Sequence, residues 1–279
     1  MLQKTLLKFT KMQALGNDFV VIDAINQKVN LTVEEAKKIA DRHLGIGCDQ
    51  ILLVEAPIEP SADFSYTLFN ADGSDGGFSG NGIRCLAKFV YEKKLTTKRD
   101  IVIGTKSRRL RAFLTDDDEV KVDIGQPIFV PEQIPLATKI ESLRYNLELG
   151  ELGKIIFGSV SVGNPHAVVL VPKIDETLVA TLGPAISKHE FFPKEVNVNF
   201  MEIIDRKHIR LRVYERGSGE TLACGSGSCA SVIIGKIWGL LDSTVVVEFA
   251  IGNLTVNWNG PDNPIFIKGP ASLVFDGFL

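Results

Sequence analysis

Two glycine-rich stretches of the chain each precede an apolar helical pattern, and they carry different side chains where the helix would begin. The first stretch is "SGNGIRC", with Ser79 at that place, and the second is "CGSGSC", with Cys224. The N–H groups at a helix start are unsatisfied and carry a partial positive charge, and glycines let a ligand approach them closely. We therefore expect each stretch to bind an anion such as a carboxylate.

A cysteine at a helix start has its thiolate favoured, so we expect the pKa of Cys224 to be lowered. If both helix starts face one substrate carboxylate, the α-carbon of that substrate lies between two side chains. One side chain can remove the α-proton from one face while the other returns a proton to the opposite face. The N–H groups would stabilise the enolate-like charge, so the two stretches predict inversion of a stereocentre.

The duplication extends beyond the two helix starts. A Gly-Asn pair ends at Asn17 and another at Asn164, and each precedes an apolar strand pattern. Gly-Ser turns at 73–74 and 217–218 repeat at nearly the same separation as these pairs and as the helix starts. A period of half the chain is far too long for a solenoid, so it indicates two homologous halves.

The elements that must position these residues are mostly strands. Thr32 and Glu35 form a capping box for a helix that we expect to end at Gly45, and further helices should follow the two glycine-rich turns. The predicted fold is α+β, with two pseudo-symmetric lobes, each a mostly antiparallel β-barrel-like sheet around a central helix. We expect an N-terminal lobe of residues 1–124 with a return of 270–279, a C-terminal lobe of 125–269, and an active site in the cleft between them. The expected strands are 18–24, 50–56, 64–69, 101–104, 119–125, 167–172, 209–215 and 244–250.

Composition limits the kind of protein. The 279 residues are 45% hydrophobic and 23% charged, with a net charge of −3 and both signs interspersed, which argues against a nucleic-acid or anionic-membrane surface. Lysines at positions 4, 8 and 11 interrupt the first apolar residues, and no run approaches membrane-spanning length, so we expect a cytoplasmic protein. The four cysteines lack metal-ligand spacing, and we expect no metal. Cys48, Cys85 and Cys229 are expected to be buried core thiols.

Eight segments along nearly the whole chain match one known family. They are "LGNDFVVID" (15–23), "DRHLGIGCDQ" (41–50), "FNADGS" (69–74), "GNGIRC" (80–85), "GNPHAV" (163–168), "IRLRVYERGSGET" (209–221), "ACGSGSCA" (223–230) and "FDGF" (275–278). In these segments the chain resembles the diaminopimelate epimerase family. That resemblance implies a cofactor-independent isomerase that interconverts LL- and meso-diaminopimelate, in lysine and cell-wall precursor synthesis, and that is commonly a homodimer.

The resemblance also implies roles for individual residues. Cys224 matches one of two acid–base thiols, and His166 and Glu215 match residues that support catalysis. Taken alone, His166 would be an ordinary loop residue and Glu215–Arg216 a surface pair. Positions that hold the substrate correspond to Asn17, Gln50, Asn70, Gly80, Asn81, Asn164, Asn197, Glu215, Arg216, Gly225 and Ser226.

Ser79 departs from the family, which has its second catalytic cysteine at that position. Cys85 cannot replace it, because six residues along a helix amount to about 600° of rotation and about 9 Å of rise. A hydroxyl is a much weaker acid than a thiol, so we expect epimerisation to be impaired. Two explanations stay open: an engineered replacement, which the otherwise intact site favours, or a natural Ser/Cys pair as in proline-racemase-like isomerases.

Functions of other classes also remain open. A cysteine acyl hydrolase would use Cys224 as nucleophile and His166 as base, but such an enzyme needs no second helix start. A non-catalytic amino-acid-binding protein would bind tightly without exchanging the α-proton, and Ser79 favours this alternative. A phenazine-type isomerase would share the fold, but the thiol and "ERGSGET" favour an epimerase.

Overall fold

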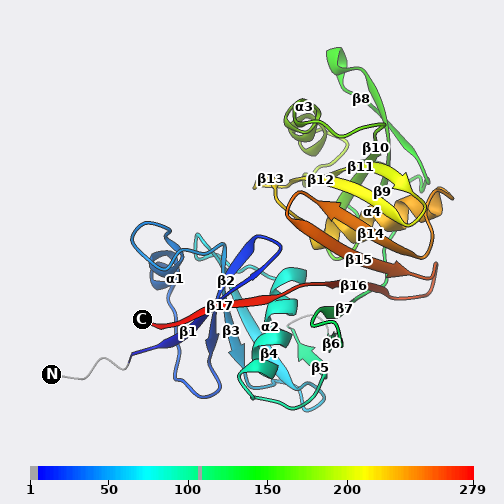
Figure 1. Cartoon of the computed structure of the whole chain (residues 1–279). Helices are drawn as coiled ribbons and strands as arrows, with labels where there is room; N and C mark the ends of the chain where they lie inside the picture. Colours follow the sequence, from blue (N-terminus) through cyan, green and yellow to red (C-terminus); the bar gives the residue numbers. More distant parts are fainter. Residues whose placement is uncertain (1–5, 106–108) are drawn as a thin grey trace. The chain divides into compact units, whose positions relative to one another are not determined.

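A computed structural model of the chain describes residues 6–105 and 109–279, so Lys4 lies outside the described residues (Figure 1). The helices are α1 (Val33–Ala40), α2 (Gly80–Glu92), α3 (Glu176–Ser187) and α4 (Gly225–Ile237), with a 3₁₀ turn, η1, at Gly150–Leu152. The first strands are β1 (Lys8–Ala14), β2 (Asn17–Asp23), β3 (Gln50–Glu55), β4 (Phe64–Asn70), β5 (Asp100–Gly104), β6 (Arg109–Leu114) and β7 (Val120–Gly125). The later strands are β8 (Tyr145–Glu148), β9 (Lys154–Ser161), β10 (Pro165–Leu170), β11 (Asn197–Asp205), β12 (His208–Glu215), β13 (Gly219–Thr221), β14 (Thr244–Phe249), β15 (Gly252–Trp258), β16 (Ile265–Gly269) and β17 (Ser272–Phe278).

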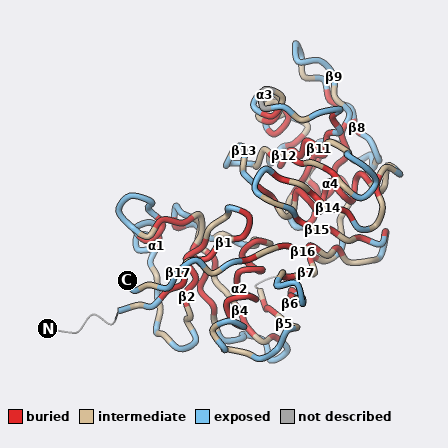
Figure 2. Tube along the Cα trace, viewed as in Figure 1, coloured by how far each residue is buried: buried red, intermediate tan, exposed pale blue. Residues whose placement is uncertain are grey.

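The two predicted central helices, α2 and α4, are buried nearly all round (Figure 2). Strands β1, β2, β3, β6 and β17 contact α2, and strands β9, β10, β11 and β15 contact α4. Cys85 and Cys229 are fully buried in these helices, and Cys48 is buried in a loop, as predicted. A helix that is apolar on every face needs such a surrounding sheet.

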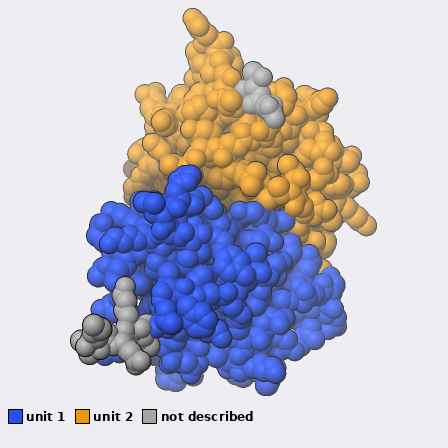
Figure 3. All heavy atoms as spheres, turned by 60° about the vertical axis from the view of Figure 1, so that its left-hand side comes forward, with its two compact units in different colours: residues 1–122, 269–279 blue, residues 123–268 orange. Residues whose placement is uncertain are grey.

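The chain divides into two compact units (Figure 3). Unit 1 contains the described residues up to Val122 together with residues 269–279, and unit 2 contains residues 123–268. The last strand, β17, therefore belongs to the unit that the N-terminal part of the chain forms, where it pairs antiparallel with β1.

The two units repeat one order of strand pairing. In unit 1, β1–β2 is antiparallel, β2–β3 parallel, β3–β4 antiparallel, β4–β5 parallel and β5–β6 antiparallel. Unit 2 has the same alternation of antiparallel and parallel pairs, beginning with an antiparallel one. Its pairs are β9–β10, β10–β11, β11–β12, β12–β14 and β14–β15. Helices α1 and α3 occupy corresponding crossovers between parallel strands, as do α2 and α4. The predicted duplication and α+β fold class are confirmed.

Helix α1 begins as predicted but ends earlier. The capping box of Thr32 and Glu35 is formed. The helix stops at Ala40 rather than Gly45, because Asp41 is extended and its carboxylate accepts the N–H groups of His43 and Leu44. Within the described residues, no helix is long and apolar enough to cross a membrane.

Candidate active site

The two helix starts have the same local geometry. Ser79 caps α2 with φ −135° and ψ 114°, and Cys224 caps α4 with φ −130° and ψ 114°. The N–H of Gly82 donates to Ser79 Oγ across 3.1 Å, and the N–H of Gly227 donates to Cys224 Sγ across 3.4 Å. Each side chain therefore acts as the N-cap acceptor of its helix.

A second matched pair ties each helix start to a neighbouring strand. In unit 1, Asn81 Nδ2 donates to Asn17 Oδ1 across 3.2 Å. In unit 2, Asn164 Nδ2 donates to Ser226 Oγ across 3.3 Å. The structure thus brings these four predicted site residues together in two equivalent places.

Strand register positions the next pair of predicted residues in each unit. Gln50 lies opposite Asn70, and its amide donates to Asn70 Oδ1 across 2.9 Å. In unit 2, Asn197 begins β11 and Glu215 ends β12, the strand that pairs antiparallel with β11. Asn197 Oδ1 accepts the N–H of Arg216 across 2.9 Å, which fixes the turn after β12.

Cys224 lies against a carboxylate. Its Sγ donates to Glu215 Oε2 across 3.3 Å and lies 3.4 Å from Ser226 Oγ. The other oxygen of that carboxylate accepts the hydroxyl of Thr221 across 2.6 Å. Thr221 is a site residue that the motifs did not indicate, although it ends the segment "IRLRVYERGSGET" and lies three residues before the cysteine.

The predicted lowering of the pKa of Cys224 is wrong for this structure. Burial raises the pKa of the thiol well above its ordinary range, and the negative charge of Glu215 adds to the effect. Hydrogen bonds from Ser226 and Gly227 act in the opposite direction but do not outweigh it. The thiol is therefore protonated in this structure and donates to Glu215.

Ser79 has different surroundings. The position that corresponds to Glu215 is Asn70, a neutral amide that donates to Ser74 Oγ across 3.0 Å. The hydrogen bond to Ser79 Oγ comes from Gly82. Unit 1 therefore carries neither a thiol nor a carboxylate at these two matched positions.

His166 is fully buried on β10. Its Nε2 lies 3.0 Å from Asn164 Oδ1, and its Nδ1 lies 3.1 Å from Asn199 Nδ2. Burial lowers the pKa of His166 to about 3, so the ring is neutral at physiological pH. Because both ring nitrogens are engaged in this way, the Cys224–His166 pair that an acyl hydrolase requires is not formed among the described residues.

Asp49 holds Asn17 in place, although no sequence motif marks it as a site residue. Its Oδ2 accepts the Asn17 amide across 3.0 Å, and its Oδ1 accepts Arg42 across 2.7 Å. Arg42 also donates to Asp18, which forms a further ion pair with Lys11. This charged cluster fixes the strand start that carries Asn17.

Arg216 combines a fixed backbone with an exposed side chain. Its N–H is bound to Asn197, and its guanidinium donates to the carbonyl of Lys194 across 3.0 Å. Such a group can add a bidentate hydrogen bond to a carboxylate ligand.

Comparison with known proteins places the chain in a family. A family model described as diaminopimelate epimerase matches residues 9–130 and 158–274. The diaminopimelate epimerase of Teredinibacter turnerae is 51% identical over 271 residues, covering 97% of this chain and 98% of that protein. The chain belongs to the diaminopimelate epimerase family. The family that the sequence motifs predict is thereby confirmed, and the matched residues include both helix starts.

Solved structures share the fold at low identity. A hydroxyproline epimerase from Agrobacterium vitis matches with a TM-score of 0.72 and 15% identity, covering 100% of this chain and 94% of that one. A phenazine biosynthesis protein of the PhzF family from Bacillus anthracis matches with a TM-score of 0.66 and 19% identity, covering 99% of both chains. The fold of this chain is therefore shared by proteins of low sequence identity.

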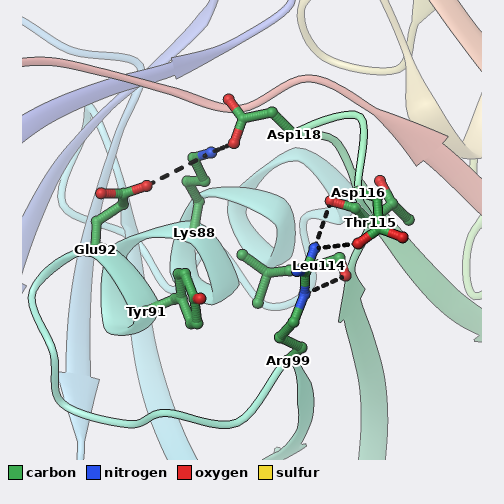
Figure 4. A pocket seen from close by; sticks show the side chains of 8 residues that line it. All are labelled: Lys88, Tyr91, Glu92, Arg99, Leu114, Thr115, Asp116 and Asp118. Atoms are coloured by element: carbon green, nitrogen blue, oxygen red, sulfur yellow. Dashed lines mark hydrogen bonds and ion pairs between the residues drawn. The ribbon is translucent and has the colours of Figure 1, made fainter.

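A hollow of about 230 Å³ in unit 1 contains none of the predicted site residues (Figure 4). Its charged side chains are paired with one another or with backbone. Arg99 donates to the carbonyl of Thr115 and forms an ion pair with Asp116, and Lys88 forms ion pairs with Glu92 and Asp118. The hollow is therefore separate from the diaminopimelate epimerase motifs.

Proposed function

We propose that this chain interconverts LL- and meso-diaminopimelate by two-base proton transfer without a cofactor, and that Ser79 impairs the reaction. One observation carries the proposal: two helix starts with matched caps, Ser79 and Cys224, in a chain of the diaminopimelate epimerase family. In this proposal the substrate α-carbon lies between the two capping side chains, in the predicted cleft between the lobes. The sequence predicts these lobes at residues 1–124 with 270–279 and at residues 125–269.

The proposed chemistry at Cys224 uses Glu215. A protonated thiol can deliver its proton to one face of the α-carbon, after which sulfur is a thiolate. In the reverse direction the thiol first passes its proton to Glu215, 3.3 Å away, and the thiolate then takes the α-proton. The N–H groups at the start of α4 would stabilise the charge on the substrate carboxylate.

The remaining predicted residues would bind the two ends of the substrate. Backbone N–H groups at Gly80 and Gly225 would hold the reacting carboxylate. The amides, the Ser226 hydroxyl and the exposed guanidinium would hold the distal ammonium and carboxylate, since a doubly zwitterionic ligand needs both donors and acceptors. These side chains are Asn17, Gln50, Asn70, Asn81, Asn164, Asn197, Arg216 and Ser226.

Isotope exchange tests the proposal. The protein is incubated with LL- and with meso-diaminopimelate separately in heavy water, and α-deuterium and stereochemistry are followed by NMR. We expect inversion to be far slower with Ser79 in place than in Ser79→Cys, while Cys224→Ala in the Ser79→Cys background should abolish the gain. Full inversion with Ser79 present would contradict the two-thiol mechanism. Inversion in neither form would contradict the proposed activity.

Ser79 also supports a second function, that of a non-catalytic amino-acid-binding protein. Such a protein should bind diaminopimelate tightly, as measured by calorimetry, without exchange of the α-proton, both in the unaltered protein and in Ser79→Cys. Recovery of exchange in Ser79→Cys would exclude it.

We also propose that the chain is a cytoplasmic homodimer. Exposed apolar side chains on β17 support the dimer, since Val274, Phe275 and Phe278 are 57%, 50% and 66% exposed. Sedimentation of the protein and of Phe278→Glu tests this, and a monomer in both would contradict it.

A further inference from the structure

A continuous series of hydrogen bonds runs through unit 2 from Asn199 to Glu215. Asn199 Nδ2 lies 3.1 Å from both Ala167 O and His166 Nδ1. The series continues from His166 Nε2 to Asn164 Oδ1 at 3.0 Å, and from Asn164 Nδ2 to Ser226 Oγ at 3.3 Å. It then runs from Ser226 Oγ to Cys224 Sγ at 3.4 Å, and from Cys224 Sγ to Glu215 Oε2 at 3.3 Å.

The direction of the first bonds follows from one backbone carbonyl. Ala167 O can only accept, so the Asn199 atom beside it must be the amide nitrogen. That nitrogen also faces His166 Nδ1, which must therefore be the accepting nitrogen of the neutral ring. The ring then carries its hydrogen on Nε2 and donates to Asn164 Oδ1, so the amide nitrogen of Asn164 is turned toward Ser226.

The other end of the series gives the same direction independently. A thiol has one hydrogen, and Cys224 gives it to Glu215, whose carboxylate can only accept. The contact between Cys224 and Ser226 must then be donated by the serine hydroxyl. Ser226 can do so because its oxygen already accepts from Asn164.

The matched bonds of unit 1 run the opposite way. Asn81 donates to Asn17, and Asn17 donates to the carboxylate of Asp49. There the donors point away from the helix start, and in unit 2 they point toward it. Asn199 keeps this orientation, with its nitrogen toward Ala167 O and His166 Nδ1, although its Oδ1 is thereby buried without a hydrogen-bond partner among the described residues.

We propose that Asn199 is a positioning residue for Cys224: by fixing His166 as the Nε2–H tautomer, it directs the Ser226 hydroxyl to donate to sulfur, where it stabilises the thiolate. The proposal deepens the proposed function, which supplies the use of the thiolate. The charged groups at this series are Glu215 beside the thiol and Arg216, whose positive charge acts on His166.

The first experiment is ¹⁵N NMR of the imidazole in the unliganded protein at neutral pH. We expect His166 Nδ1 to have the chemical shift of an unprotonated ring nitrogen and Nε2 that of a protonated one. Asn199→Asp places a pure acceptor at Nδ1, so it should move a proton there. A His166 that carries its proton on Nδ1 in the unaltered protein would overturn the proposal without any variant.

The second experiment is a double-mutant cycle of Asn199→Asp and Ser226→Ala. The readout is the pH dependence of iodoacetamide alkylation at Cys224, followed by peptide mass spectrometry. Asn199→Asp should slow alkylation at neutral pH more when Ser226 is present than in Ser226→Ala. We expect the difference to be about fivefold, which is what the loss of one ordinary hydrogen bond implies. An effect of the same size in both backgrounds would mean that the new carboxylate acts on sulfur directly, and the positioning role would be rejected. Both experiments use unliganded protein, so a failure of the proposed epimerisation would not alter their outcome.

Discussion

The thiol of Cys224 donates to the carboxylate of Glu215 across 3.3 Å, from the residue that caps α4 to the residue that ends β12. This bond makes unit 2 chemically different from unit 1, although both units share their strand order and cap geometry. Burial is the main reason that the thiol stays protonated, and the negative charge of Glu215 adds to it.

Glu215→Gln should make Cys224 more reactive toward alkylation. Burial remains, but loss of the neighbouring negative charge should lower the pKa of the thiol. We expect the rate of alkylation at neutral pH to rise about tenfold, because more of the thiol is then ionised. Iodoacetamide alkylation measured across pH checks this.

Glu220→Gln is the matched control, because Glu220 pairs with Arg212 on the same hairpin rather than with the thiol. It should leave the alkylation profile of Cys224 unchanged. If the pH profile of alkylation shifts equally in both variants, the effect comes from the overall charge of the β12–β13 hairpin and not from the contact between Glu215 and the thiol.

Ser79→Cys should raise the rate of inversion by about 10²–10⁴, the range that one acid–base group supplies. The cap geometry already suits a thiol, because Cys224 occupies the same φ and ψ in unit 2. The rate of meso-diaminopimelate formation from the LL isomer measures the gain. Ser74→Cys, which adds a thiol at an exposed turn, should give no gain.

Asp18→Asn should destabilise the protein by about 2 kcal/mol at neutral pH and reduce its acid sensitivity. Burial acts to raise the pKa of Asp18, but hydrogen bonds from Arg42 and Lys11 outweigh it, so the pKa is lowered. A lowered carboxylate pKa contributes stability above the unfolded value of about 3.9, and this stability is lost as pH falls toward the folded value. Urea midpoints at several pH values test this, with the exposed Asp116→Asn expected to show no effect.

Gly227→Ala should destabilise more than Gly82→Ala, although both glycines occupy the same place in their helices. A Cβ at Gly227 would lie 2.4 Å from Asn199 Oδ1, whereas the nearest atom to a Cβ at Gly82 is 3.3 Å away. We expect a loss of about 1–3 kcal/mol at Gly227 and little change at Gly82, where helix propensity offsets crowding. Thermal unfolding of the two variants checks this, and equal shifts would contradict it.

The parts of the fold that the sequence predicts correctly have local causes. The capping box, the glycine-rich helix starts and the β-branched runs each act within a few residues. Helix α3 is not among the expected helices, because Gly183 and Pro184 lie inside it. Strands β1 and β17 are not among the expected strands, although residues 270–279 are expected to return to the N-terminal lobe, because their residue patterns do not show which strand each of them pairs with.

The sequence predicts which residues form the site but not how their surroundings shift the pKa of the thiol. The motifs named the residues at both helix starts, and the structure brings them together within each unit. The direction of the Cys224 pKa shift was wrong because it depends on burial and on how closely Glu215 approaches sulfur. Asn199 and Asp49 act through other side chains, so neither has a signature of its own in the sequence.

The return of β17 to unit 1 has a consequence for the order of folding during synthesis. The strand supplies pairing partners for β1, and Asp276 accepts from Thr10 and Lys93. A growing chain cannot complete unit 1 until residues 269–279 have left the ribosome, whereas all of unit 2 emerges before them. The segment of unit 1 that is made before unit 2 must therefore wait, and the β1 edge stays open to wrong partners until β17 has been made.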